Sequence, residues 1–377
     1  MKKIAGVSIF VIFFYVIATT QTNSRVNIVT TAVPFLRISP DARAGGMGDV
    51  TIVTSPDASA IYYNLAKVPF ATSPTSISLT YTPWLKEYVN DVYMINLAAY
   101  HKLDEIQSVA AAIRYFNLGS MSFTDFQGNE LGKGRPREFS IDVGYSRKLL
   151  NKLSLGLTFR YINSNLASGY AINGITYKTG HAIATDISAY YSTIDNENVN
   201  GWRFGAALSN LGSKIGYTNN ANSKEFIPAN LALGASYTHV FQKMHSLCIG
   251  VDINELLVPP SPTLTTNPIE NNQQLEKYRS QSVISSWFSS LQNNVQQTQI
   301  GIGTEYWYNE QFAFRVGYNY ANKALAYKRY ATIGAGINYN NAQLNISYLI
   351  PSGSTLIRNP LSNTLRFSLL FAFKKNN

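Results

Sequence analysis

Apolar and polar side chains alternate along most of the chain after residue 75. In the segment SISLTYT, Ile77, Leu79 and Tyr81 share one parity, and serine or threonine occupies the other. A period of two places successive side chains on opposite faces of an extended strand, so each such segment predicts a β-strand. Fourteen segments carry the pattern, near residues 76–82, 92–100, 108–116, 138–146, 153–162, 182–191, 202–209, 230–239, 246–254, 298–306, 311–319, 330–339, 343–350 and 364–373.

The length and number of these segments indicate the class of protein. Most segments span about ten residues, the length of a tilted strand that crosses an outer membrane, and bacterial single-chain barrels have an even number of strands. The apolar face often ends in an aromatic residue, which suits the headgroup level of a membrane. We therefore predict an all-β membrane protein, a fourteen-stranded antiparallel outer-membrane β-barrel over residues 75–377. The aromatic residues at strand ends are Tyr81, Tyr93, Tyr115, Tyr145, Tyr161, Tyr237, Tyr306, Tyr318, Tyr339 and Tyr348.

The connections between the predicted strands alternate in length. Those after even-numbered strands are short, as in SRKLLNK and YNEQ, whereas most of those after odd-numbered strands are long. Outer-membrane barrels combine short periplasmic turns with longer extracellular loops. We expect extracellular loops at 117–137, 163–181, 210–229, 255–297 and 351–363, short outer connections near Lys86 and Ala321, and both termini in the periplasm.

The amino terminus predicts export from the cytoplasm. Lys2 and Lys3 precede an apolar run from Ile4 to Ile17, and small residues follow it. This order is typical of a secretory signal peptide, which we place at residues 1–20; an N-terminal membrane anchor is the alternative. No later stretch reaches about 18 apolar residues, so no transmembrane helix is predicted. The single cysteine, Cys248, excludes an intramolecular disulfide framework.

Charged residues inside the predicted strands all lie on the polar parity. An arginine on the lipid side costs about 2–4 kcal/mol at the membrane midplane, so this placement predicts a polar lumen. The charges either form structural ion pairs, or some of them hold a plug or guide a ligand. The residues are Arg114, Arg160, Arg203, Arg315 and Arg366, with the acids Asp142, Asp186, Asp252 and Glu305.

The segment 21–74, before the first strand, contains charges of both signs and a cluster of glycines. Its stretch FLRISPDARAGGMGDV lacks the lysine that follows the glycines of a phosphate-binding loop. We therefore interpret its glycines as turn positions of a plug that folds into the barrel mouth, with Ser55 or Asp57 capping a short helix. The expected plug and lumen residues are Arg37, Asp41, Arg43, Gly45, Gly46, Gly48, Asp49, Asp57, Arg114, Arg160, Arg203, Arg315 and Arg366.

Two motifs in this segment carry a family resemblance. ARAGGMGDV and PDASAIYYNLAKV, followed by fourteen strands, resemble the FadL-like outer-membrane proteins, whose plug has a Gly-rich turn and an Asn-Pro-Ala motif. Here Asn64-Leu65-Ala66 stands at the position of Asn-Pro-Ala and lacks its proline. Within these proteins the chain is most similar to the PorV family of the type IX secretion system, through FLRISPDARAGGMGDV, YTPWL and RFSLLFAF.

The resemblance implies a non-enzymatic function. Proteins of that family receive secreted cargo by its C-terminal signal domain at a large translocon barrel and deliver it to a sortase-like attachment protein. The implied partners are the translocon barrel, the cargo signal domains and the attachment protein, together with outer-membrane lipid and lipopolysaccharide. A FadL-type channel for long-chain fatty acids or other hydrophobic small molecules is the alternative function.

Two of the expected outer loops contain candidate partner-binding residues. In loop 255–297, the residues Leu275, Tyr278, Val283, Trp287, Phe288 and Leu291 predict one side of a short helix. The Trp287–Phe288 pair favours partner binding, with packing over the barrel rim as the alternative. Loop 117–137 offers Phe123, Phe126, Lys133, Arg135 and Arg137. Its bases suit lipopolysaccharide phosphates or an acidic partner, and a solvated basic loop is the alternative.

The search for catalytic and metal-binding motifs is negative. The four histidines, His101, His181, His239 and His245, lack metal-ligand spacing, and no Gly-x-Ser-x-Gly motif occurs. We therefore expect no enzyme activity, no metal, no cofactor and no nucleic-acid partner.

Overall fold

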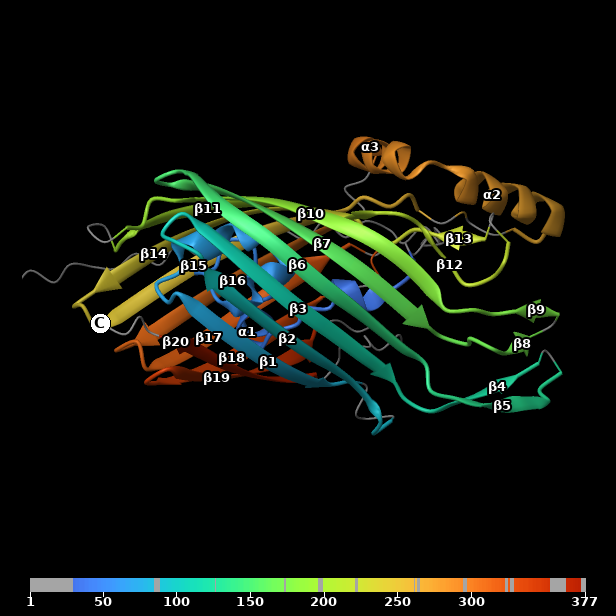
Figure 1. Cartoon of the computed structure of the whole chain (residues 1–377), viewed down its shortest axis with the longest axis horizontal. Coiled ribbons are helices and arrows are strands. Elements are labelled where there is room, and N and C mark those ends of the chain that lie inside the picture. The colour runs from blue at the N-terminus through green and yellow to red at the C-terminus, as the bar shows by residue number, and fades with distance from the viewer. Residues whose placement is uncertain are drawn as a thin grey trace, which may run out of the picture.

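The computed structural model describes residues 30–84, 89–125, 127–172, 174–195, 199–220, 223–260, 262, 265–293, 297–322, 325, 329–352 and 364–373. Over these residues fourteen strands form one closed antiparallel barrel (Figure 1), which confirms the predicted fold class. The predicted signal peptide (1–20), residues 21–29 of the predicted plug segment, and Phe126 lie outside the described residues.

Each barrel strand contains one of the segments predicted from the alternation, or all but its terminal residues. The strands are β1 (Thr75–Pro83), β2 (Val92–Lys102), β3 (Gln107–Leu118), β6 (Arg137–Leu150), β7 (Leu153–Asn165), β10 (Gly180–Ser192), β11 (Gly201–Gly212), β14 (Asn230–Phe241), β15 (His245–Leu256), β16 (Thr298–Tyr308), β17 (Phe312–Ala321), β18 (Tyr330–Tyr339), β19 (Ala342–Pro351) and β20 (Leu365–Phe373). Neighbours along the chain pair with each other, and β20 pairs with β1, with Leu79 opposite Leu369. The ring therefore has no free strand edge.

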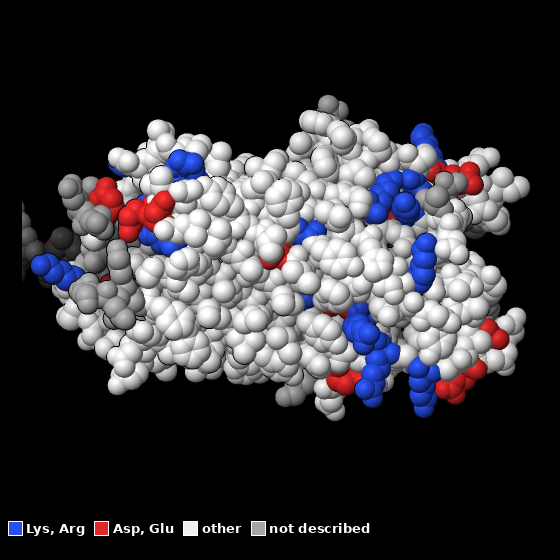
Figure 2. Space-filling view, viewed as in Figure 1, with Lys and Arg blue, Asp and Glu red and all other residues white. Residues whose placement is uncertain are grey.

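Burial follows the sequence alternation. On β1, Ile77, Leu79 and Tyr81 are exposed on the outer wall, whereas Ser78 and Thr80 are buried inside. The outer wall is thus an apolar surface suited to lipid, and the polar parity faces the lumen. Figure 2 shows charged side chains gathered toward the two ends of the molecule, with the middle of this face almost free of them.

The two ends of the barrel differ. One end has tight turns, in which Gln242 with Lys243 and Asn309 with Glu310 adopt the positive φ angles of type I′ hairpins. We call this the short-turn end. At the other, the long-loop end, the described residues form three two-stranded sheets and two helices (Figure 1). These elements are β4 (Met121–Thr124), β5 (Glu130–Gly134), β8 (Ala171–Ile172), β9 (Ile175–Thr176), β12 (Ile215–Gly216), β13 (Lys224–Glu225), α2 (Pro268–Ser280) and α3 (Val283–Asn293).

Residues 30–74 fill the lumen as a plug of short helical turns, drawn in blue in Figure 1. Short polar side chains start three of the turns: Asp41 accepts from Ala44 N, Asp57 from Ser59 N, and Asn64 from Ala66 N. Capping satisfies amide groups that the first turn of a helix leaves unpaired. The turns are η1 (Pro34–Arg37), α1 (Ala42–Gly46), η2 (Ala58–Tyr62) and η3 (Leu65–Phe70). Among the helices of the described residues, none is sufficiently long and apolar to cross a membrane.

The plug runs through the lumen from one end to the other. Ala32 N donates to Phe226 O in the loop region next to β13, so the described chain starts at the long-loop end. It enters β1 at Thr75, opposite Phe373 at the end of β20, at the short-turn end. The plug thus crosses the lumen once before β1 runs back. The two termini, which we predict in the periplasm, lie outside the described residues.

Candidate functional site

Arg43 of α1 connects the plug to the barrel wall through a buried ion-pair cluster. Its guanidinium donates twice to Glu305 of β16, at 2.8 and 2.7 Å, and once to Asp57 of the plug at 3.0 Å. Arg315 of β17 donates to the same Glu305 carboxylate at 2.7 Å. Buried charges are costly unless they are paired and hydrogen bonded, so the carboxylate holds the two guanidinium groups in a fixed arrangement.

Two other lumenal arginines also meet the plug. Arg114 of β3 donates to Leu36 O at 3.1 Å and lies over the Tyr62 ring, 4.4 Å from its centroid. Arg366 of β20 lies 3.9 Å from the Asp49 carboxylate. These contacts tie the plug to both sides of the seam between the first and last strands.

Arg160 and Arg203 instead connect strands of the wall. Arg160 forms ion pairs with Asp142 at 2.8 Å and Asp186 at 2.9 Å, which joins β6, β7 and β10. Arg203 is half-buried and donates to Thr238 on β14 at 2.7 Å. The two interpretations of the lumenal charges therefore apply to different arginines: some hold the plug and others connect strands.

The glycines of the plug lie directly on glycines of the wall. A Cβ atom on Gly46 would lie 3.1 Å from Gly334 Cα, and one on Gly317 would lie 2.1 Å from Gly48 N. Gly48 also has a positive φ of 66°, which glycine adopts without strain. The wall glycines Gly301, Gly303, Gly317 and Gly334 were not among the expected site residues. The sequence could have indicated them through parity. Gly301 and Gly303 share the parity of the buried Glu305, Gly317 that of Arg315 and Gly334 that of Thr332, which leaves a flat strip on the inner wall.

Polar side chains of the wall form hydrogen bonds with the backbone of the plug. Gly48 N donates to Thr332 Oγ1 at 2.8 Å, and Asn319 Nδ2 donates to Gly48 O at 2.9 Å. On β15, the Asp252 carboxylate accepts from Ile52 N at 2.8 Å and also from Thr51 N. The buried backbone of the plug cannot hydrogen bond to water, and these bonds to the barrel satisfy its N–H and C=O groups instead.

Asn64 fixes the turn that a proline would otherwise constrain. Its Oδ1 accepts from Ala66 N at 3.1 Å, and its Nδ2 donates to Ile52 O at 3.1 Å and to Ala189 O at 3.0 Å. All three polar positions of the amide are thus used within the lumen. The asparagine makes this turn without the proline of the Asn-Pro-Ala motif.

Burial perturbs the charges inside the plug. Burial, with Asp57 nearby, raises the pKa of Asp41, whose carboxylate accepts from Tyr63 Oη at 2.7 Å. Burial also lowers the pKa of Lys67 to about 8; its Nζ donates to Thr51 O at 2.8 Å and to Thr54 Oγ1 at 2.9 Å. Burial lowers the pKa of Arg37 to about 10. Asp41 and Lys67 thus bond to other groups of the plug itself.

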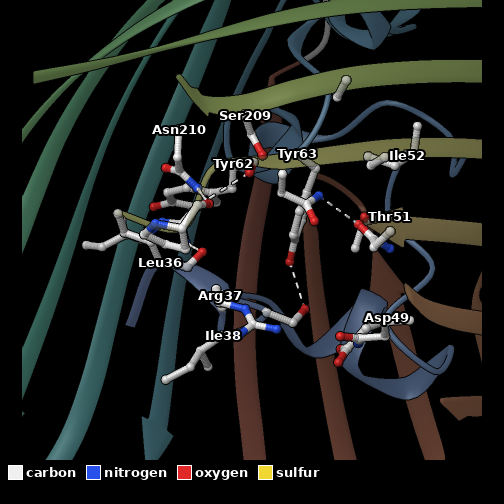
Figure 3. A pocket seen from close by; sticks show the side chains of 18 residues that line it. Leu36, Arg37, Ile38, Asp49, Thr51, Ile52, Tyr62, Tyr63, Ser209 and Asn210 are labelled. Carbon is white, nitrogen blue, oxygen red and sulfur yellow. Dashed lines mark hydrogen bonds between the residues drawn. The ribbon is translucent and has the colours of Figure 1, made fainter. Parts of the chain in front are cut away.

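The cavities between plug and wall differ in size. One of about 650 Å³ lies at the short-turn end, between Phe70 and Tyr190. The cavity beside Arg37 has a volume of only about 120 Å³, and Figure 3 shows Arg37 and Tyr63 of the plug facing it, with Ser209 and Asn210 of β11 opposite. Typical ligand pockets measure roughly 300–1,000 Å³, so this space suits a few water molecules. A mostly apolar cavity of about 480 Å³ lies at the long-loop end, between residues 30–34, Tyr217 and Tyr278.

The loop residues differ in exposure. Phe123 packs against Tyr170, with ring centroids 4.4 Å apart, which joins the β4–β5 and β8–β9 hairpins. Arg135 and Arg137 are exposed. The prediction of a single helix from the apolar residues of loop 255–297 is wrong. The chain forms α2 and α3, because Ser282 starts a new helix: its Oγ accepts from Ser285 N at 3.1 Å. Trp287 is half-buried, whereas Phe288 is exposed.

No group of three His, Cys, Asp or Glu side chains in the described part of the chain is placed to hold a metal ion.

Comparison with known families identifies the chain. Residues 20–263 match the family model described as Type IX secretion system protein PorV. The chain belongs to the PorV family. The Gly-rich plug motif, the first strands and their loops all lie inside the matched region, as do β14 and β15. No curated protein matches the sequence of this PorV-family chain.

Solved structures share its fold at low sequence identity. A monoaromatic hydrocarbon channel, the TodX deltaS2S3 mutant, is 14% identical, covers 88% of this chain and 99% of its own, and has a TM-score of 0.52. The monoaromatic hydrocarbon channel CymD is 11% identical, with 89% and 98% covered and a TM-score of 0.52. A FadL homologue of Pseudomonas aeruginosa is 9% identical, with 89% and 99% covered and a TM-score of 0.45. The PorV-family chain thus shares the barrel fold of the TodX and CymD channels.

Proposed function

We propose that this protein is a cargo carrier of type IX secretion in the outer membrane. In this proposal it binds the C-terminal signal domain of secreted proteins at the translocon barrel and delivers them to the sortase-like attachment protein. Membership of the PorV family supports the pathway. The observation that carries the mode of action is the plug, which crosses the lumen from the long-loop end to the short-turn end and which Glu305 holds through Arg43. A filled lumen favours binding at the ends of the barrel over passage through it.

The long-loop end is the side we assign to the cell surface and to these partners. Its hairpins project beyond the barrel (Figure 1) and stack through Phe123 and Tyr170, which stiffens them. Arg135 and Arg137 are exposed there and provide positive charge for an acidic partner or for lipopolysaccharide phosphates. Rigid loops at one end of a barrel are suited to hold a folded signal domain, because little conformational entropy is lost on binding.

A channel for hydrophobic small molecules is the second candidate. The apolar cavity of about 480 Å³ at the long-loop end favours it, since this volume lies in the range of ligand pockets. Passage into the periplasm requires the plug to move, because its buried residues lie between this cavity and the short-turn end. The two functions therefore differ in what they require of the plug.

A cysteine lock on the plug separates the two functions. Ala42 N donates to Ser368 Oγ at 2.8 Å, so residues 42 and 368 are neighbours, and the pair Ala42→Cys and Ser368→Cys is chosen to link α1 to β20 on oxidation, with disulfide formation checked by mass spectrometry. For a carrier we expect cargo to reach the surface at the wild-type level with the disulfide formed, and signal domains to co-purify with the protein. Each single-cysteine variant is the control. Loss of cargo delivery on oxidation, restored by a reductant, would contradict a carrier with a fixed plug, and loss of hydrophobic uptake alone would favour the channel.

A further inference from the structure

Helix α3 has its polar and apolar faces arranged opposite to those of a helix packed on a protein core. Ser286 and Ser290, four residues apart, are buried, with 1% and 2% of their surface exposed. Ile284, Phe288 and Leu291 are 63%, 65% and 49% exposed. At about 100° per residue these three side chains fall on one face of the helix, and the two serines fall on the opposite face. The apolar face thus points away from the protein.

The contacts of α3 place it at the rim of the barrel wall. Val283, its first residue, packs against a cluster that contains Leu256 from the end of β15 and Ala321 from the end of β17. The preceding turn is held by Lys214, whose Nζ donates to Arg279 O and Gln281 O, both at 2.7 Å. After α3 the chain enters β16 at Thr298. In Figure 1 the helix lies outside the outline of the barrel, beside the wall.

This position continues the lipid-facing surface. Ile253 of β15 is exposed on the outer wall and lies three residues before Leu256, about 10 Å along the strand at roughly 3.3 Å per residue. Strand tilt shortens this distance along the membrane normal, so Val283 at the start of α3 lies within about one headgroup layer of the apolar band. Figure 1 shows the rest of α3 beside the outer wall. On β17, Tyr318 and Tyr320 are exposed at the same end, where aromatic side chains mark the interface.

The composition of this segment points to the same environment. Between Ser280 and Glu305 the sequence has no Lys, Arg, Asp or Glu. The projection that α3 forms is accordingly uncharged in Figure 2, whereas charges lie on the neighbouring α2. An interfacial helix inserts its apolar face about 5–10 Å into the boundary between headgroups and acyl chains, where a charge is costly.

We propose that α3 is an interfacial anchor, whose Ile284, Phe288 and Leu291 insert into the leaflet at the long-loop end. The occupant of the apolar face is lipid, because the face adjoins the apolar band of the barrel and has no charge that would orient a protein partner. The anchor holds loop 255–297 down on the membrane surface and so fixes its height relative to the other loops.

Spin labels on two faces of the same helix test the anchor. In a Cys248→Ser background, we would place a nitroxide at Phe288→Cys and, as matched control, at Ser289→Cys, which is exposed but turned by about 100° from it. Phe314→Cys, on the outer wall of β17, reports the lipid environment and Glu276→Cys on α2 the aqueous one. In purified protein reconstituted into bilayers, we expect the ratio of oxygen to nickel-chelate accessibility at position 288 to resemble that at 314 and to be several-fold higher than at 289 or 276.

Two outcomes would overturn the anchor. One is an accessibility ratio at position 288 equal to that at 276 in the reconstituted bilayer. The other is protection of position 288 from the nickel chelate only when native membranes supply the translocon, which would assign the face to a protein partner. Detergent-solubilised protein provides the check that the labelled variants retain their fold, since their heat-resistant β-structure is expected to match that of the parent.

Discussion

The Arg43 guanidinium in the plug and the Glu305 carboxylate in β16 face each other with two parallel hydrogen bonds, of 2.8 and 2.7 Å. The pair is buried and shares its acid with Arg315. We expect Arg43→Ala to destabilise the plugged barrel by about 3–5 kcal/mol, because removal of one partner leaves a buried charge with less compensation. The measurement is urea unfolding of the protein in lipid vesicles, combined with protease accessibility of residues 30–74.

The exposed acid Glu105 provides the matched control. It forms an ion pair with Lys102 in a short turn, and its side chain is 83% exposed. Surface pairs of this kind contribute about 0–1 kcal/mol, so Glu105→Ala is expected to leave both measurements almost unchanged. Equal effects of the two substitutions would show that the plug does not depend on Arg43.

A second prediction concerns Gly48. A Cβ atom there would lie 2.7 Å from Ile302 O and Tyr318 N, and the residue has a positive φ. Gly48→Ala is expected to push the plug off the wall and to increase the exchange of its amide hydrogens with solvent. Gly128→Ala is the control, since Gly128 also has a positive φ but its added Cβ meets nothing within 4 Å. Similar hydrogen exchange in the plug of both variants would rule out a steric fit.

A third prediction concerns Asn64. Asn64→Ala removes three hydrogen bonds and is expected to lower stability by about 1–3 kcal/mol, the cost of unsatisfied buried partners. Asn64→Asp keeps the acceptor for Ala66 N but places a carboxylate against Ile52 O and Ala189 O. We therefore expect Asn64→Asp to have a lower melting temperature than Asn64→Ala at neutral pH. The reverse order would count against the assigned hydrogen bonds.

A fourth prediction concerns Lys67, whose burial makes the stability of the folded protein depend on pH. Burial lowers its pKa in the folded protein to about 8, below the value of about 10.4 in an unfolded chain. Between these two values the unfolded state binds more protons than the folded state, so this residue makes stability rise with pH. Below about pH 8 both states are charged and the cost of burying the charge is fully present. We expect the melting temperature of the wild type, relative to Lys67→Met, to increase from pH 8 to 10, and a flat difference would contradict the prediction.

The barrel was predictable from the sequence because its signal is local. Alternation with a period of two is visible within each strand, and it also assigned Glu305 and Arg315 to the lumen. The partner of Glu305 was not predictable, since Arg43 lies 262 residues away and several acids of the same parity compete for it. Charge sign restricted the possible pairs, but only the register of the strands decided among them.

The errors in the long loop have a different physical origin. The apolar residues from Leu275 to Leu291 suggested one helix, because their spacing does not show where a cap interrupts the chain. Ser282 acts as such a cap, and a serine in a serine-rich stretch is weak evidence for one. The exposure of Phe288 depends on the position of α3 beside the wall, which the sequence does not show. Wall glycines such as Gly317 could be seen in the sequence, but their contact with the plug could not.

The bond from Ala42 N to Ser368 Oγ spans 326 residues, nearly the whole chain. An early part of the described chain thus receives part of its contacts from β20, a late strand that pairs with β1. Helix α1 also packs against β18 and β19, which are almost as late. The plug can complete these contacts only when β20 is paired with β1. A chain that lacked β20 would therefore also lack the hydroxyl that Ala42 N donates to, so a fully bonded plug reports a closed barrel.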